Sequence, residues 1–115
     1  MTEYQLTVPT SVGYKIADEL LHLCQAAGGS TLMVGIGSWI HPETGECIEE
    51  SVGQHTFIVD DWIAHNNHKF VDQLNATVRA LHREGEHTVL IRRLSGRGIA
   101  HFFLANGMGV EVPYR

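Results

Sequence analysis

The sequence predicts an α+β domain built from one antiparallel sheet with two helices on one face. Three observations favour this class. The 115 residues are enough for one compact domain and little else. Segments of strand-like alternation are interleaved with two segments whose apolar residues recur at helical spacing. No linker, repeat or low-complexity stretch interrupts them, so residues 1–115 are interpreted as a single domain.

The first strand and the first helix are predicted from the N-terminal quarter of the chain. Residues 3–8 alternate, are rich in β-forming side chains, and end at Pro9. Thr10 or Ser11 can then cap a helix, which Gly28 terminates. Its buried stripe is predicted to consist of Val12, Ile16, Leu20, Leu23, Cys24 and Ala27.

The next two strands are predicted to form a hairpin. Residues 30–36 form the second strand and are followed by a glycine-containing loop and a turn over residues 41–45. Residues 46–59 form a long third strand, which we expect to be bent or bulged near Gly53.

The second half of the chain repeats the alternation of helix and strand. Asp60 or Asp61 caps a second helix, which ends at Gly85. Residues 87–93 form the fourth strand, and the turn at residues 95–98 leads into a short extra strand with the sequence IAHFFL. The buried stripe of this helix is predicted to be Phe70, Leu74, Thr77, Val78 and Leu81.

The resulting order, βαββαβ plus a C-terminal hairpin, is the ferredoxin-like order, with both helices on one face of the sheet. No third helix is available to cover the opposite face. We therefore expect this face to be covered by self-association.

Charge and composition exclude several classes of protein. The chain has 8 Lys and Arg against 13 Asp and Glu, and the net charge of −5 is unfavourable for binding nucleic acid. No apolar run reaches the length of a membrane span, and the N-terminal MTEYQLTV does not resemble a secretory signal. Cys24 and Cys47 form no CxxC pair, which favours a reducing cytoplasm.

Metal and dinucleotide sites are not indicated. His65 and His68 are three residues apart, but no cysteine or aspartate cluster supplies further ligands, so a surface or capping role is the preferred interpretation. The segment from Gly35 to Trp39, GIGSW, lacks the third glycine and the following helix of a dinucleotide fingerprint. We interpret it as a loop whose glycines allow close approach of a backbone or a small ligand.

Three carboxylates lie where strands begin. Glu49 and Glu50 are adjacent at the start of the third strand, so their side chains point to opposite faces. Glu86 lies at the junction of the second helix and the fourth strand, and this fold can bring it near Glu50 at one rim. Charged residues at strand ends are usually only solvated, and periodicity alone does not decide between the two interpretations.

Two segments favour a functional role for these carboxylates: residues 28–50, GGSTLMVGIGSWIHPETGECIEE, and residues 83–91, REGEHTVLI. Together with the element order over residues 4–104, they resemble the phage S-adenosylmethionine lyases, formerly called S-adenosylmethionine hydrolases. The resemblance implies cleavage of S-adenosylmethionine to 5′-methylthioadenosine and homoserine lactone without a cofactor. It also implies homotrimers with active sites between subunits, and removal of the methyl donor that host restriction and modification systems need.

The resemblance also implies roles for individual residues. Glu50 matches the family's essential glutamate, although Glu49 could be the matching residue, and Glu86 matches a second polar position of the site. Trp39 stands where the family often has tyrosine, which puts any role of a hydroxyl group in doubt. From the chemistry of the substrate, the backbone of Gly35, Ile36, Gly37 and Ser38 is a candidate for hydrogen bonds to adenine or to the substrate carboxylate.

Two other functions remain open from the sequence. Ferredoxin-like trimers that bind nucleotides without catalysis usually have a long loop between the second and third strands, whereas the connection over residues 37–45 is short. A phage inhibitor that mimics DNA would need a larger acidic excess than this chain has.

Overall fold

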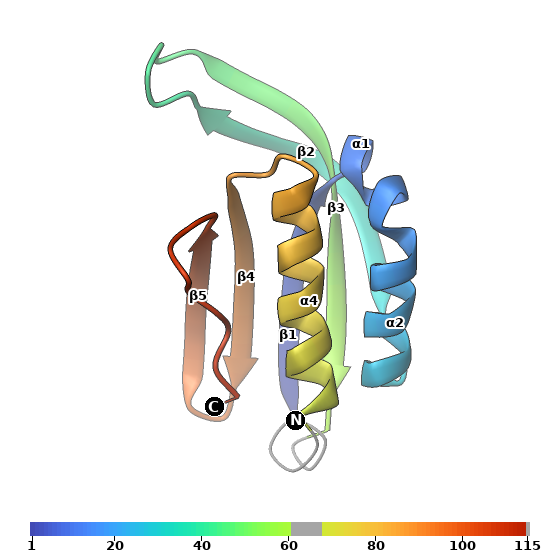
Figure 1. Cartoon of the computed structure of the whole chain (residues 1–115). Coiled ribbons are helices and arrows are strands. Elements are labelled where there is room, and N and C mark those ends of the chain that lie inside the picture. The colour runs from blue at the N-terminus through green and yellow to red at the C-terminus, as the bar shows by residue number, and fades with distance from the viewer. Residues whose placement is uncertain (61–67, 115) are drawn as a thin grey trace.

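The described residues form a five-stranded sheet with helices on one face (Figure 1). The computed structural model describes residues 1–60 and 68–114. The strand order is β2-β3-β1-β4-β5 and all neighbours are antiparallel, which confirms the ferredoxin-like prediction with an added C-terminal hairpin. The strands are β1 (Thr2–Pro9), β2 (Thr31–Ile40), β3 (Cys47–Val59), β4 (Thr88–Ser95) and β5 (Gly98–Ala105).

The first helical segment is divided, whereas the sequence predicts one continuous helix from residue 10. Its three parts are α1 (Thr10–Gly13), the 3-10 turn η1 (Tyr14–Ile16) and α2 (Ala17–Ala27). The division lies at Gly13, a residue of low helix propensity. The predicted cap is also wrong, because the Thr10 hydroxyl donates to the Ser51 carbonyl of β3 at 3.2 Å and does not bond the helix end.

The C-terminal ends of both helices follow the predictions, whereas the start of the second helix does not. Gly28 ends α2 with φ of 88°, and Gly85 follows α4 (Lys69–Arg83) with φ of 98°. The N-cap of α4 is His68, so the cap predicted at Asp60 or Asp61 is wrong for this helix; residues 61–67 lie outside the described residues. Within the described residues, no helix is long and apolar enough to cross a membrane.

The core lies between the sheet and the helices. Tyr4 of β1 and Phe57 of β3 pack against Phe70 of α4, with ring centroids 4.9 and 5.7 Å apart. All five residues of the predicted α4 stripe are buried. In the first helical segment Val12, Ile16, Leu23 and Ala27 are buried, and Leu20 and Cys24 pack at the margin, so both predicted stripes are confirmed.

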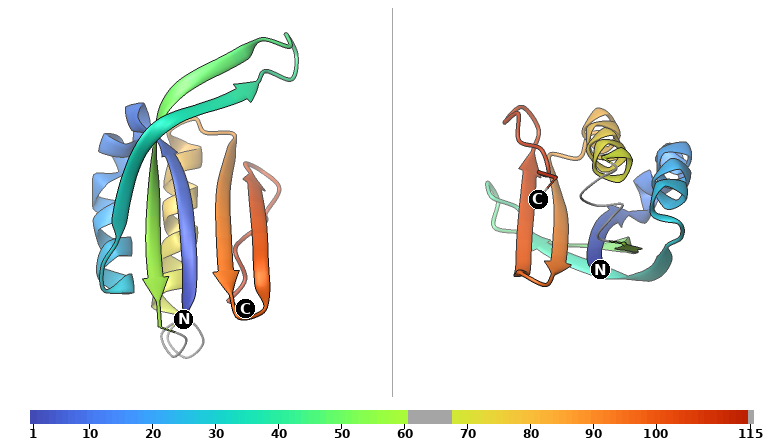
Figure 2. Two further views of the ribbon diagram at one scale, coloured as in Figure 1. Left: turned by 180° about the vertical axis from the view of Figure 1, so that it is seen from behind. Right: turned by 90° about the horizontal axis from the view of Figure 1, so that it is seen from below.

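The opposite face of the sheet carries no helix (Figure 2). We call this surface the open face; its side chains alternate with buried ones along β1, β4 and the second half of β3. A polar row of Gln5, Arg92 and His101 runs across its middle, and the buried Arg92 Nε has no hydrogen-bond partner among the described residues. Large exposed apolar side chains of the open face are Met33, Trp39, Ile58, Leu90, Leu94, Ile99 and Phe103.

β2 and the first part of β3 extend past the rest of the sheet (Figures 1 and 2). β1 pairs with β3 only as far as Val52, whereas β2 stays paired with β3 to Ile40. We call the projecting part, residues 35–51, the hairpin arm. The loop predicted at Gly35–Trp39 is therefore wrong, because these residues continue β2 and pair with the long β3. β3 bends, as predicted, but its register is uninterrupted through Gly53, so the alternative of a bulge is wrong.

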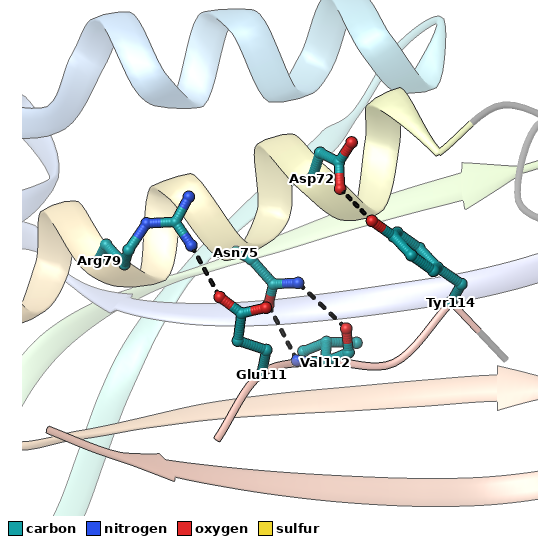
Figure 3. A network of polar contacts seen from close by, with 6 residues as sticks. All are labelled: Asp72, Asn75, Arg79, Glu111, Val112 and Tyr114. Atoms are coloured by element: carbon teal, nitrogen blue, oxygen red, sulfur yellow. Dashed lines mark hydrogen bonds and ion pairs between the residues drawn. The ribbon is translucent and has the colours of Figure 1, made fainter. Parts of the chain in front are cut away.

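The C-terminal segment is tied to α4 by side-chain contacts (Figure 3). The amide of Asn75 accepts from the Val112 N–H at 2.9 Å and donates to the Val112 carbonyl at 3.1 Å. Asn75 and Val112 are both buried. On either side, Arg79 pairs with Glu111 at 3.0 Å, and the Tyr114 hydroxyl donates to Asp72 at 2.5 Å.

We expect Asn75→Leu to destabilise the protein by about 2–4 kcal/mol, because it leaves two buried backbone groups of Val112 without partners. Arg79→Ala is the matched control on the same helix: its ion pair with Glu111 is exposed, so its loss should cost less than about 1 kcal/mol. Urea unfolding of both variants measures the difference. Equal losses would contradict the importance assigned to the Asn75 amide.

Candidate functional site

A pocket opens on the open face where β1 and β4 separate. The two strands pair only between Glu3 and Leu6 of β1 and the facing residues of β4, and beyond Leu6 they diverge. The pocket occupies the gap between them and has a volume of about 100 Å³. Its lining consists of Thr7, Pro9, Glu50, Val52, Leu81, Glu86, Thr88, Val89 and Leu90.

Glu50 enters this pocket from β3. It is paired with Gly37 of β2 and shares the open face with Val52, and its side chain is partly buried. Glu49 is paired with Ser38, points to the other face and is exposed. The prediction that the two neighbouring glutamates face opposite ways is confirmed, and only Glu50 lines the pocket.

Glu86 reaches the same pocket from the turn between α4 and β4. Gly85 reverses the chain with positive φ, and the Glu86 N–H donates to the Leu81 carbonyl at 3.1 Å. The structure therefore brings Glu50 and Glu86 to one rim, as the sequence predicts.

The electrostatics of the pocket follow from these two carboxylates. Burial raises the pKa of Glu86, the negative charge of Glu50 raises it further, and the imidazole of His87 acts in the opposite direction. A raised pKa means that the folded protein favours the protonated form of Glu86 over the ionised form. Its contribution to the stability of the fold is therefore present at low pH and is lost as the pH rises through the pKa of the folded state. A cationic ligand in the pocket would stabilise the two ionised carboxylates, whereas the phosphates of a nucleotide would be repelled by them.

We expect Glu50→Gln to lower the pKa of Glu86, because the substitution removes one of the two causes that raise it. Burial, the larger cause, remains, so the pKa should stay above its ordinary range. Titration of the Glu86 side-chain carbon signal by NMR measures the change, with Glu49→Gln as the control. An unchanged Glu86 titration in Glu50→Gln would show that the two carboxylates do not interact.

Trp39 lies on the open face but outside the pocket. It is paired with Ile48, two residues closer to the arm tip than Glu50, and its indole is 44% exposed. The ring stacks on His41 with centroids 6.0 Å apart. Within one chain, the structure therefore does not bring Trp39 to the pocket that holds the two carboxylates.

The segment Gly35–Ser38 borders the site as a strand. Gly35 and Gly37 occupy positions whose side chains would lie on the open face, opposite Val52 and Glu50. Because glycine has no side chain, the backbone is uncovered there. A Cβ on Gly37 would approach Val52 Cγ1 to 3.1 Å, which is a tight contact. Ile36 and Ser38 point to the other face. Since β2 is an edge strand, its outer backbone groups face away from β3 and are available to a ligand or another chain.

Residues that the sequence does not indicate as site residues complete the pocket. Thr7 and Thr88 bring hydroxyl groups to it, and Leu81 and Leu90 supply apolar walls. The ferredoxin-like order of elements places the end of the first strand near the start of the fourth, but it does not single out these two threonines.

A second pocket lies on the helix side of the sheet. It has a volume of about 240 Å³ and is mainly apolar, with His55 and Tyr14 in its lining. Burial lowers the pKa of His55, so its imidazole is neutral at pH 7. None of the site residues predicted from the sequence lines this pocket.

No group of three or more His, Cys, Asp or Glu side chains in residues 1–60 and 68–114 is arranged to hold a metal ion. His68 packs against the Tyr114 ring at 4.0 Å between centroids. His65, the other member of the histidine pair, lies outside the described residues.

Comparison with known proteins shows that the chain shares its fold with solved structures, although its sequence identity to them is low. No family model and no curated protein matches the chain. A phage SAM lyase in complex with S-methyl-5′-thioadenosine superposes with a TM-score of 0.65 and 10% identity, covering 95% of this chain and 92% of the other. A phage SAM lyase in the apo state gives a TM-score of 0.60 and 16% identity with the same coverage. The resemblance predicted from the sequence is thus confirmed at the level of the fold.

Proposed function

We propose that this chain is a lyase that cleaves S-adenosylmethionine to 5′-methylthioadenosine and homoserine lactone without a cofactor. The observation that carries the proposal is the convergence of Glu50 and Glu86, from distant parts of the sequence, on one pocket. A fold shared with phage SAM lyase structures, one of them holding S-methyl-5′-thioadenosine, supports it.

The reaction needs few protein groups because the substrate contains its own nucleophile and leaving group. A carboxylate oxygen attacks the γ-carbon of the methionine moiety and closes a five-membered lactone. The bond from this carbon to sulfur breaks, and its electron pair neutralises the sulfonium. Since a negative and a positive charge disappear together, a site poorer in water than bulk solvent accelerates the step. Folding the methionine tail so that its carboxylate faces the γ-carbon lowers the barrier further.

Glu50 is assigned to the α-ammonium group of the substrate. A carboxylate held against the sulfonium would stabilise the ground state more than the transition state, in which that positive charge is being lost. Bonded to the ammonium, which keeps its charge throughout, Glu50 orients the tail instead. Glu86 shares this role, since its raised pKa marks a carboxylate that gains from a cationic partner.

One chain supplies only part of such a site. The pocket of about 100 Å³ is well below the roughly 300 Å³ or more that enclosing a ligand of this size requires. The open face around it carries large exposed apolar side chains, Leu90 and Phe103 among them. We therefore assign the remainder of the site to a second copy packed on this face, in a homotrimer with sites between subunits.

The hairpin arm supplies further groups in that assembly. Trp39 lies on the same face as Glu50 and would stack on adenine or contact the sulfonium region. The backbone of Gly35–Ser38 would bond adenine or the substrate carboxylate. In an infected cell, removal of S-adenosylmethionine from the cytoplasm would deprive restriction and modification systems of their methyl donor.

Incubation of the purified protein with S-adenosylmethionine, followed by chromatography, tests the proposal. We expect many equivalents of 5′-methylthioadenosine and homoserine lactone per chain, with the same yield when a chelator is present. Binding without turnover would contradict the lyase and favour a sensor, and neither binding nor turnover would favour an inhibitor that acts through a protein interface.

A further inference from the structure

We propose that His82 is a positioning residue that holds Glu86 in the site; this inference rests on the proposed function. His82 lies in the last turn of α4, and its Nδ1 is 2.7 Å from the backbone carbonyl oxygen of Glu86. A carbonyl oxygen only accepts, so Nδ1 carries the hydrogen and donates. His82 does not line the pocket, and it therefore acts on the site through Glu86.

The turn that carries Glu86 depends on this contact. The Gly85 N–H donates to the His82 carbonyl and the Glu86 N–H donates to the Leu81 carbonyl, each at 3.1 Å. These two bonds fix the backbone on the N-terminal side of Glu86. The Glu86 carbonyl precedes β4, which begins at Thr88, and the His82 ring is the donor that reaches it.

The position of the Glu86 backbone sets the point from which its side chain extends into the pocket. With both its N–H and its carbonyl bonded to the end of α4, the Glu86 backbone has little freedom to move away from the pocket. Leu81, the residue before His82, itself lines the pocket, so the same helix turn forms the wall and holds the acid. Loss of the His82 bond leaves the Glu86 carbonyl unsatisfied and frees this side of the turn.

Two substitutions of His82 separate the effect of its hydrogen bond to Glu86 from the effect of its side-chain size. His82→Leu removes the donor and keeps an apolar side chain of similar size, whereas His82→Asn places an amide N–H close to the position of Nδ1. We expect His82→Leu to lower kcat/KM for S-adenosylmethionine by about tenfold, as for loss of one transition-state contact, and His82→Asn to restore most of it. His22→Leu, at an exposed histidine of α2, is the control and should leave kcat/KM unchanged.

The double variant tests whether His82 acts through Glu86. In a Glu86→Gln background, where the carboxylate is already absent, His82→Leu should lower kcat/KM by less than about twofold. The same tenfold loss in both backgrounds, or no loss in the wild-type background, would overturn the inference.

An NMR readout separates this inference from the proposed function, because it needs no turnover. His82→Leu should change the Glu86 amide shift and the titration of its carboxyl group, and His82→Asn should largely retain both. If S-adenosylmethionine is not cleaved but these signals change, the lyase proposal fails while the positioning of Glu86 by His82 stands. If the Glu86 signals are unchanged in a folded His82→Leu protein, the inference is wrong whatever the protein does.

Discussion

Glu50→Gln is expected to lower kcat/KM for S-adenosylmethionine cleavage by roughly 10- to 150-fold. Glutamine keeps the size of the side chain and some hydrogen bonding, but it loses the charge-assisted bond to the α-ammonium group, which is worth about 1.5–3 kcal/mol. A tail that then adopts an unproductive pose would increase the loss. The rate of 5′-methylthioadenosine formation measures it.

The chain offers a matched control at the preceding residue. Glu49→Gln makes the same chemical change on the other face, outside the pocket, and should be nearly silent. Glu86→Gln should fall between the two. An active Glu50→Gln variant together with an inactive Glu49→Gln variant would show that the functional carboxylate lies on the face away from this pocket. Full activity in all three variants would show that the mechanism does not need these carboxylates.

Phe103→Asp is expected to convert the proposed trimer to monomers and to lower the activity per chain by more than about 100-fold. Phe103 is 66% exposed in the single chain and lies on the open face. In the proposed assembly it is buried, where an unpaired carboxylate costs several kcal/mol in each contact. Light scattering measures the mass, which should fall from three times the 12.8 kDa of one chain to one chain.

Leu21→Asp is the control for this experiment. Leu21 is 54% exposed on α2, across the sheet from the open face, so the variant should remain trimeric and active. Circular dichroism should show both variants folded. A wild-type mass of about 13 kDa at micromolar concentration would contradict the assembly and the intersubunit site with it.

The order of elements and both buried stripes could be predicted because they follow from local periodicity. The extent of β2 could not be predicted in the same way. Glycines at 35 and 37 resemble a loop when taken alone, and they form a strand because the long β3 offers partners as far as Cys47. Comparing the lengths of the two predicted strands would have revealed this, since a strand of residues 46–59 needs a partner longer than residues 30–36.

The candidate site was predictable only in part for a related reason. Glu50 and Glu86 are distinctive residues at strand ends, and the fold predicted from the order of elements brings them together. Thr7 and Thr88 resemble any other strand residues, and their meeting depends on where β1 and β4 separate. His82 contacts the backbone carbonyl of Glu86, and every residue has such a carbonyl. The sequence therefore does not indicate which residue His82 bonds.

The edge of the sheet formed by β2 has a consequence for how the chain must mature. Natural edge strands are commonly protected by lysine, proline or a bulge, and Thr31–Ile40 contains no charged residue, no proline and no interruption of its register. In the proposed assembly, a newly synthesised copy therefore faces a kinetic competition, in which packing against the correct neighbour must outpace indiscriminate pairing of exposed strands. Under the proposed assembly, rapid association serves solubility as well as activity, and a substitution that slows it would reduce the yield of protein before it reduced the rate of any reaction.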